Sequence, residues 1–233
     1  PAVQSQLHSA RRRVEEAASD VPDQGRAETD LGRLCLLYLH YELLDAAEPC
    51  LLQMRTLQPS EFQWPYYLAV LYSRNAEIES AKESLETARV LRPMDVPTLL
   101  RLGDLHLLSS QLEPAQEAFE VALLQDPQSS AARFGLGRVA IARGSTEQGI
   151  THFDVALAGQ PAGSVIHHHL GMAYRSIGDL DRAREELQKN NHQTIAFSDP
   201  LMRQLETLSV SREEIFVRGV EARRQGRPGE AIE

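Results

Sequence analysis

Three consecutive histidines, His167–His169, are the residues that first suggest chemistry, because imidazole is a common metal ligand. The surrounding pattern is helical, and successive side chains on a helix point about 100° apart. The three rings therefore cannot face one ion. Gly171 and Met172 stand one turn further along, where a second ligand would be needed, and only His152 on the preceding helix remains as a partner. We expect no metal site, and instead one packed, one groove-facing and one exposed histidine.

Catalytic motifs are absent from the sequence. It has no Gly-x-Ser-x-Gly elbow, no phosphate-binding glycine loop and no zinc-type Cys-x-x-Cys pair. The glycines Gly135, Gly137 and Gly144 lie within or at the end of a predicted helix rather than after a strand. We therefore expect no catalytic residue, no cofactor and no enzyme activity in this chain. The alternative is a recruiting or regulatory arm of a larger enzyme, for example a glycosyltransferase, whose catalytic domain follows residue 233.

The two cysteines, Cys35 and Cys50, are too few for a disulfide scaffold. Both fall at positions that suit helical packing, which favours two unpaired thiols. A disulfide between them remains the alternative, and the pair does not identify the redox compartment.

The overall charge and hydropathy exclude two classes of protein. A formal net charge of −9 argues against nucleic-acid binding, which requires a basic surface. No apolar run reaches the roughly 18–20 residues that a membrane span needs. We expect a soluble compartment, cytoplasmic or, where a signal has been removed, periplasmic.

Four prolines recur at a fixed interval. Pro59, Pro93, Pro127 and Pro161 are each 34 residues apart. Because proline cannot donate the helical hydrogen bond, each is expected to follow the end of a helix. A period of 34 residues is that of a repeated helix–turn–helix unit.

Other positions follow the same frame. A leucine followed by a small residue recurs in the first helix of each unit, as Leu34–Cys35, Leu68–Ala69, Leu102–Gly103, Leu136–Gly137 and Leu170–Gly171. A small residue recurs early in the second helix, as Ala47, Ala81, Ala115, Gly149 and Ala183. We expect these small residues to meet where the two helices cross, with Gly103 near Ala115 and Gly137 near Gly149.

This set of positions resembles the tetratricopeptide repeat family, over about residues 28–197. The resemblance implies an all-α fold, a right-handed superhelix (α-solenoid) of stacked helix–turn–helix repeats. It divides the chain into an N-terminal capping helix and linker (1–27), five repeats (28–61, 62–95, 96–129, 130–163 and 164–197), an inserted segment (198–211) and the start of a sixth, truncated repeat (212–233). The first segment could instead reach into a partner molecule. We expect a short helix over 200–208, and we expect the native chain to continue beyond 233.

In this family the first helices line a concave groove. The positions that would face it are Leu36, Tyr66, Val70, Arg74, Leu100, Asp104, Leu107, Phe134, Arg138, Ile141, His168, Met172 and Arg175. Some of these could pack between neighbouring repeats. We expect four of the apolar ones, Tyr66, Leu100, Phe134 and Ile141, to form an open stripe that receives a helix or an extended peptide. Replacing Leu100 and Phe134 with glutamate should then abolish partner capture and leave the fold unchanged.

The function that the resemblance implies is a non-catalytic adaptor for protein–protein interaction. Some family members hold a C-terminal carboxylate with Asn and Lys in the first helices. The corresponding positions here include Leu36, Asp104 and Arg138, and none is Asn. The expected partner is therefore another protein or peptide. The remaining alternative is a self-assembling homo-oligomeric scaffold.

Overall fold

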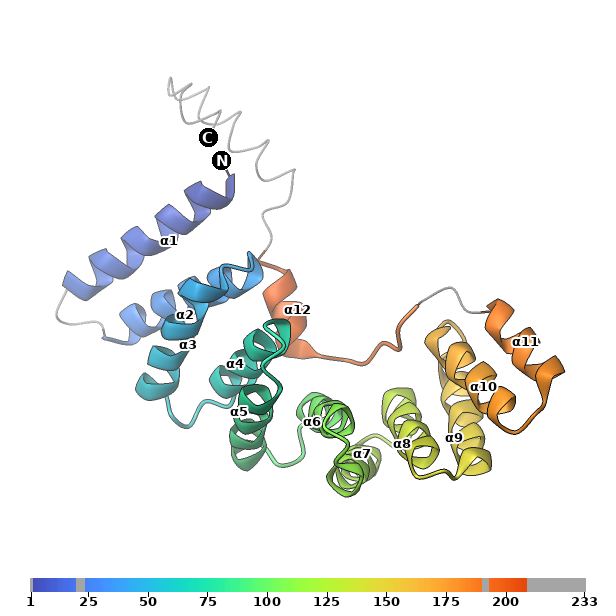
Figure 1. Cartoon of the computed structure of the whole chain (residues 1–233). Coiled ribbons are helices and arrows are strands. Elements are labelled where there is room, and N and C mark those ends of the chain that lie inside the picture. Colours follow the sequence, from blue (N-terminus) through green and yellow to red (C-terminus); the bar gives the residue numbers. More distant parts are fainter. Residues whose placement is uncertain (1, 20–23, 190–192, 209–233) are drawn as a thin grey trace. The chain divides into compact units, whose positions relative to one another are not determined.

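A computed structural model describes residues 2–19, 24–189 and 193–208, and every regular element in these ranges is an α-helix (Figure 1). This confirms the predicted all-α fold. The residues fall into two compact units, unit 1 (1–71 and 200–233) and unit 2 (72–199). The predicted sixth repeat, 212–233, lies outside the described residues.

Unit 1 combines the start of the chain with a helix from near its end. Its helices are α1 (Ala2–Ser19), α2 (Gln24–His40), α3 (Leu44–Leu57), α4 (Gln63–Arg74) as far as Leu71, and α12 (Pro200–Glu206). The helix α2 packs against α1, α3 and α12. The hydroxyl of Tyr67 donates a hydrogen bond to the carbonyl oxygen of Leu201 (3.0 Å), and Leu205 is 2% exposed, so α12 is an integral part of this unit.

Unit 2 is a stack of helical hairpins. Its helices are α5 (Ile78–Leu91), α6 (Val96–Leu108), α7 (Leu112–Gln125), α8 (Ser130–Ala142), α9 (Thr146–Gly159), α10 (Val165–Ser176) and α11 (Leu180–Lys189). The pairs α6–α7, α8–α9 and α10–α11 form hairpins, and each hairpin packs on the next through α7–α8 and α9–α10. Unit 2 is thus an α-solenoid. The second helices of the two units begin at 44, 78, 112, 146 and 180, so the sequence period is also the structural period.

The turn inside each hairpin uses one left-handed residue. These residues have φ between 57° and 84° and are Glu42, Ala76, Ser110, Gly144 and Gly178. The residue after each donates its N–H back to a first-helix carbonyl, as from Ser145 to Ala140 (2.9 Å). This arrangement is a Schellman motif, which satisfies carbonyl groups that the helix end would leave unpaired.

Substitutions at these left-handed positions should change stability in opposite directions. A side chain at a positive φ costs about 1 kcal/mol, so Gly144→Ala should lower the free energy of unfolding by about that amount. A Cβ added at Gly144 meets nothing within 4 Å, so the loss would come from the backbone alone. Ala76→Gly should leave stability unchanged or raise it, although Ala→Gly inside a helix costs about 1 kcal/mol. Urea denaturation of both variants measures this, and changes of the same sign would contradict the assignment.

The helix crossings are as close as the small residues predict. A Cβ built on Gly137 would lie 3.2 Å from the carbonyl oxygen of Gly149, which confirms that crossing. The nearest atoms to a built Cβ belong to an aromatic ring at both glycines, that of Phe153 at Gly137 (2.4 Å) and that of Phe119 at Gly103 (2.6 Å). A Cβ on Gly135 of the next repeat would lie 2.4 Å from the same ring. The aromatic ring therefore occupies the space that two glycines leave.

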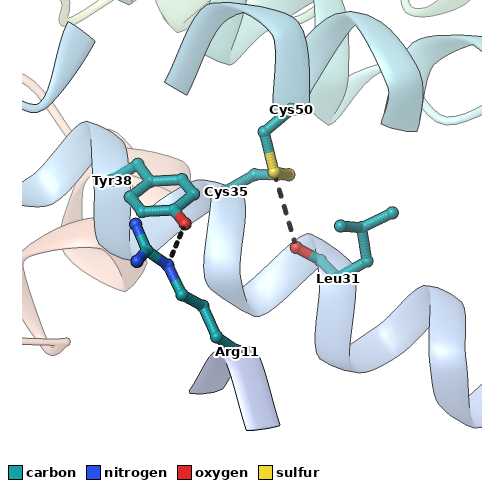
Figure 2. The surroundings of a disulfide bond; sticks show 5 residues. All are labelled: Arg11, Leu31, Cys35, Tyr38 and Cys50. Carbon is teal, nitrogen blue, oxygen red and sulfur yellow. Dashed lines mark hydrogen bonds between the residues drawn. A yellow bond between two sulfur atoms is a disulfide. The ribbon is translucent and has the colours of Figure 1, made fainter. Parts of the chain in front are cut away.

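The two cysteines form a disulfide, which corrects the expectation of unpaired thiols (Figure 2). Cys35 of α2 and Cys50 of α3 face each other across the hairpin, with their Cα atoms 5.3 Å apart. The sulfur of Cys50 lies 4.0 Å from the carbonyl oxygen of Leu31. On the neighbouring face, Arg11 Nε of α1 donates to the Tyr38 hydroxyl (2.7 Å). The positions suit packing, as expected, but the same closeness allows the bond.

Removing the disulfide should destabilise unit 1. The bond closes a loop between residues separated by 15 positions, and such a loop stabilises a fold by about 3 kcal/mol. We expect Cys35→Ser with Cys50→Ser to lower the urea midpoint of the oxidised protein. Adding reductant should lower the midpoint of the wild type and leave that of the double variant unchanged. Equal midpoints for oxidised and reduced wild type would contradict this prediction.

Candidate partner-binding site

Four predicted groove residues are buried in the structure. Leu36, Tyr66 and Val70 of unit 1 and Leu100 of unit 2 are each at most 5% exposed. Leu100 belongs to a core cluster with Phe119 and its neighbours. The expectation of an open apolar stripe at these positions is therefore wrong. The physical reason is that adjacent faces of one first helix also contact its own second helix and the next repeat.

Phe134 and Ile141 also contribute to packing between repeats. Both are half-buried against the cluster formed around Phe153 and its neighbours. The ring of Phe134 lies 5.5 Å from that of Phe153 and 4.8 Å from that of His169. A Cβ added at Gly149 would lie 2.6 Å from Cδ1 of Ile141. These two side chains hold α8, α9 and α10 together and do not form a free apolar surface.

Five of the predicted residues do form an accessible set in unit 2, which we call the first-helix face: Asp104, Arg138, His168, Met172 and Arg175. Arg138 of α8 pairs with Asp104 of α6 at 2.5 Å and lies 5.6 Å over the ring of Phe134. Met172 occupies the same repeat position in α10 and is 46% exposed. Leu107 is half-buried against a core cluster, and Arg74 is exposed near the end of α4.

An extended segment, residues 193–199, runs along unit 2 and was not predicted as a bound element. We call it the strap (Figure 1). The N–H of Val165 donates to the carbonyl oxygen of Gln193, and the N–H of Gln193 donates to Ser164 Oγ, both at 2.9 Å. The side chain of Gln160 accepts from the N–H of Ala196 (3.0 Å) and donates to its carbonyl oxygen. Two strap residues thus have both main-chain groups paired with the repeats.

The sequence carried two signals for the strap. Asn190 stands at the position that Ala88, Ala122 and Ala156 hold in other repeats, and Ile195 replaces the terminal proline. Ile195 and Phe197, the two large apolar residues of this segment, are then spaced two apart, which is the period of an extended chain with one face bound. The repeat frame assigned residues up to 197 to the fifth repeat and residues from 198 to the inserted segment, so this spacing was not used.

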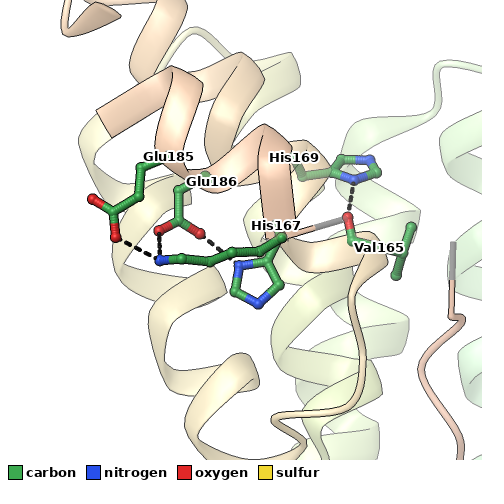
Figure 3. A network of polar contacts seen from close by, with 6 residues as sticks. Val165, His167, His169, Glu185 and Glu186 are labelled. Carbon is green, nitrogen blue, oxygen red and sulfur yellow. Dashed lines mark hydrogen bonds and ion pairs between the residues drawn. The ribbon is translucent and has the colours of Figure 1, made fainter. Parts of the chain in front are cut away.

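His167 and His169 point in different directions (Figure 3). His167 donates from Nδ1 to Glu186 of α11 (2.6 Å), and Glu186 also accepts from Lys189 (2.9 Å). Burial alone would raise the pKa of Glu186, but the hydrogen bonds from His167 and Lys189 lower it. Hydrogen bonds to Glu185 and Glu186 raise the pKa of Lys189 to about 12. This cluster joins the two helices of one hairpin.

His169 lies on the opposite side of α10, packed against aromatic rings. Its ring is 4.8 Å from that of Phe134 and 5.7 Å from that of Phe153. Burial lowers the pKa of His169 from its usual 6.5, a shift that the hydrogen bond to the carbonyl oxygen of Val165 opposes. His168 is exposed. Within the described ranges, no group of three metal-binding side chains is found.

The half-buried His169 should make stability depend on pH. Its lowered folded pKa means that the unfolded state takes up the proton first. The contribution of the neutral ring to the free energy of unfolding is complete above the pKa that His169 has in the unfolded state, near 6.5. It is lost as pH falls through the pKa that His169 has in the folded state. We expect His169→Gln to weaken the fall in urea midpoint between about pH 7.5 and pH 5. Identical pH profiles for His169→Gln and wild type would contradict this prediction.

Comparison with known families identifies the repeat. Two tetratricopeptide repeat models match the sequence, one over residues 100–164 and one over 165–189. Residues 100–189 are tetratricopeptide repeats. No curated protein matches the sequence of this chain.

Solved structures share the fold of this chain. One from Parabacteroides merdae has 18% identity and a TM-score of 0.69, covering 98% of this chain and 84% of its own. MamA from Desulfovibrio magneticus RS-1 has 19% identity and a TM-score of 0.65, covering 79% and 97%. YrrB, described as having an unusual peptide-binding site, has 17% identity and a TM-score of 0.61, covering 79% and 91%. At these identities the neighbours show that the fold is shared.

One further property follows from the hydropathy of the helices in this chain. Across the part of the chain that the structure describes, no helix combines the length and apolar character needed to cross a membrane.

Proposed function

We propose that this chain is a non-catalytic adaptor that binds a segment of a partner protein at the first-helix face of unit 2. The observation that carries the proposal is a row of side chains at one repeat position in three successive first helices. Asp104, Arg138 and Met172 occupy this position, and none of the three belongs to the buried core. A surface that repeats in register is well suited to a linear partner.

The chemistry of the face indicates what it would hold. Arg175 and the half-buried Arg138 offer guanidinium donors for acidic or carbonyl groups. The exposed thioether of Met172 lies between them in sequence and offers a soft, adaptable apolar contact. A partner segment with an apolar residue flanked by acidic ones fits this combination.

The test is capture of partners from native lysate with charge-reversed variants. Arg138→Glu with Arg175→Glu should lose a protein that the wild type retains. The matched control reverses two arginines on second helices, Arg89→Glu with Arg184→Glu, whose side chains are 43% and 73% exposed. We expect the control to retain the partner. Retention by both variants would reject the first-helix face as the binding surface.

A further inference from the structure

We propose that the strap is an internal ligand of unit 2, and that its channel also accepts an extended partner peptide with the pattern apolar–x–apolar–x–acidic. In the strap itself this pattern is Ile195, Phe197 and Asp199. The channel is built from Arg101, Gln160, Ser164 and their neighbours, and none of its contacts uses the first-helix face. The inference therefore stands independently of the proposed function.

The main chain of the strap is held as a bound peptide is held. Gln160 pairs through its amide with both the N–H and the carbonyl oxygen of Ala196. Ser164 and Val165 do the same for Gln193, three residues earlier. Such contacts recognise an extended backbone whatever its side chains, as in the addition of a strand to a sheet edge. They would serve any peptide of the same conformation equally well.

The side chains of the strap alternate between the repeats and water. Thr194, Ala196 and Ser198 are exposed, whereas the residues between them are half-buried or buried. Ile195 packs against the cluster around Phe153, and Phe197 packs against the cluster around Phe119. This is the two-residue period of an extended chain with one face bound. Two apolar positions of the strap are thereby selected by shape.

The acidic position is selected by charge. Asp199 is 7% exposed and pairs with Arg101 at 2.9 Å. The guanidinium of Arg101 also lies 5.8 Å over the ring of Phe197. Arg101 of α6 therefore contacts two positions of the strap. A charge-assisted pair of this kind discriminates strongly against peptides that lack the carboxylate.

The strap leaves room beside it. A pocket of about 440 Å³ is lined by Ala196, Phe197 and Ser198 together with the loops that precede α8 and α10. A peptide with a larger side chain at the Ala196 position would fill space that the strap does not. The strap is therefore replaceable by a partner segment of the same pattern, and a tethered segment competes at an effective concentration on the order of millimolar.

The experiment measures binding of a fluorescent peptide with the strap sequence Gln193–Asp199 to the full chain by anisotropy. In wild type the strap competes, so binding should be weak. A strap variant, Ile195→Ser with Phe197→Ser and Asp199→Ser, leaves the channel unaltered and should bind the peptide at least about tenfold more tightly.

Two further variants are controls for this result. Adding Gln160→Ala and Arg101→Gln to the strap variant should remove the gain in affinity. Thr194→Ala, on the exposed side of the strap, should bind as wild type does.

The register of the peptide provides a further control. A peptide in which Ile195 exchanges with Ala196, and Phe197 with Ser198, keeps the composition and should not bind.

A second variant is available where the triple strap variant does not fold. If the triple variant fails to show a wild-type circular dichroism spectrum, Phe197→Ala replaces it. Hydrogen exchange then adds a readout in wild type, because saturating peptide should speed exchange of the Ala196 amide. A folded strap variant that binds no better than wild type would overturn the proposal, as would tight binding that survives the Gln160 and Arg101 substitutions. Lysate capture at the first-helix face reports separately on the proposed function.

Discussion

Replacing Phe119 with alanine should lower the free energy of unfolding by about 3–5 kcal/mol, the range for deletion of a buried aromatic ring. Phe119 is 1% exposed. A Cβ added at Gly103 in α6 or at Gly135 in α8 would overlap its ring. The two glycines have no side-chain atoms that could fill the cavity left when the ring is removed. The site therefore cannot collapse easily, which places the expected loss toward the upper part of the range.

The consequence extends beyond one hairpin, because the ring joins two successive repeats. In a solenoid, cooperativity depends on contacts between neighbouring repeats. We expect urea denaturation of Phe119→Ala, followed by circular dichroism, to show a lower midpoint and a broader transition than wild type. Leu124→Ala on the same helix is the control, since Leu124 is 76% exposed and should change stability by less than about 0.5 kcal/mol.

A double-mutant cycle tests the geometry directly. Gly135→Ala should destabilise the wild type, because its Cβ would come within 2.4 Å of the ring. In the Phe119→Ala background the same methyl group enters empty space and should cost far less. Additive effects of the two substitutions would show that the ring and the glycine are not in contact.

The repeat architecture could be predicted from the sequence because its causes are local and recur. Proline after each second helix and small residues at each crossing act within one hairpin, and each is repeated every 34 residues. The crossing of Gly137 and Gly149 illustrates this, since a Cβ on either glycine would come within 3.2 Å of the other's carbonyl oxygen. The short helix expected over 200–208 lies in the inserted segment, outside the repeat frame, and the structure shows it as α12 over Pro200–Glu206.

The binding surface could be predicted only in part, because burial depends on what packs against a helix from elsewhere in the chain. A repeat frame identifies which residues face away from the second helix, but it does not show what covers them. Leu100 and Phe134 sit one turn from exposed positions, yet the structure places both in packed clusters. The strap contributes Phe197 and Ile195 to these clusters, and it comes from a segment outside the repeat pattern.

The disulfide was missed for a related reason. Composition shows two cysteines but not the distance between them. Position 35 lies at the crossing position of its first helix, and position 50 lies one turn after the small residue Ala47 of the second. Residues at such positions face each other across a hairpin. The frame that identified packing positions thus also contained the reason for a 5.3 Å approach of the two Cα atoms.

Leu100→Glu should unfold unit 2 or weaken it by about 3–5 kcal/mol, the cost of leaving an unpaired charge inside a protein. This reverses the expectation from the sequence that glutamate at this position would spare the fold. Leu100 is 2% exposed and lies in the cluster of Phe119 and Leu136. A carboxylate there would lose its hydration, and the surrounding side chains of the cluster are apolar.

The matched control introduces the same side chain elsewhere on the same helix. Leu108, at the end of α6, is 66% exposed, so Leu108→Glu should shift the urea midpoint little. Thermal and urea unfolding of both variants in the full chain compares burial while the chemistry of the substitution stays constant. Equal stability of the two variants would mean that Leu100 faces water. That result would favour the open apolar stripe expected from the sequence. A large loss at Leu100 alone would leave the polar first-helix face and the strap channel as the surfaces of unit 2 available to a partner.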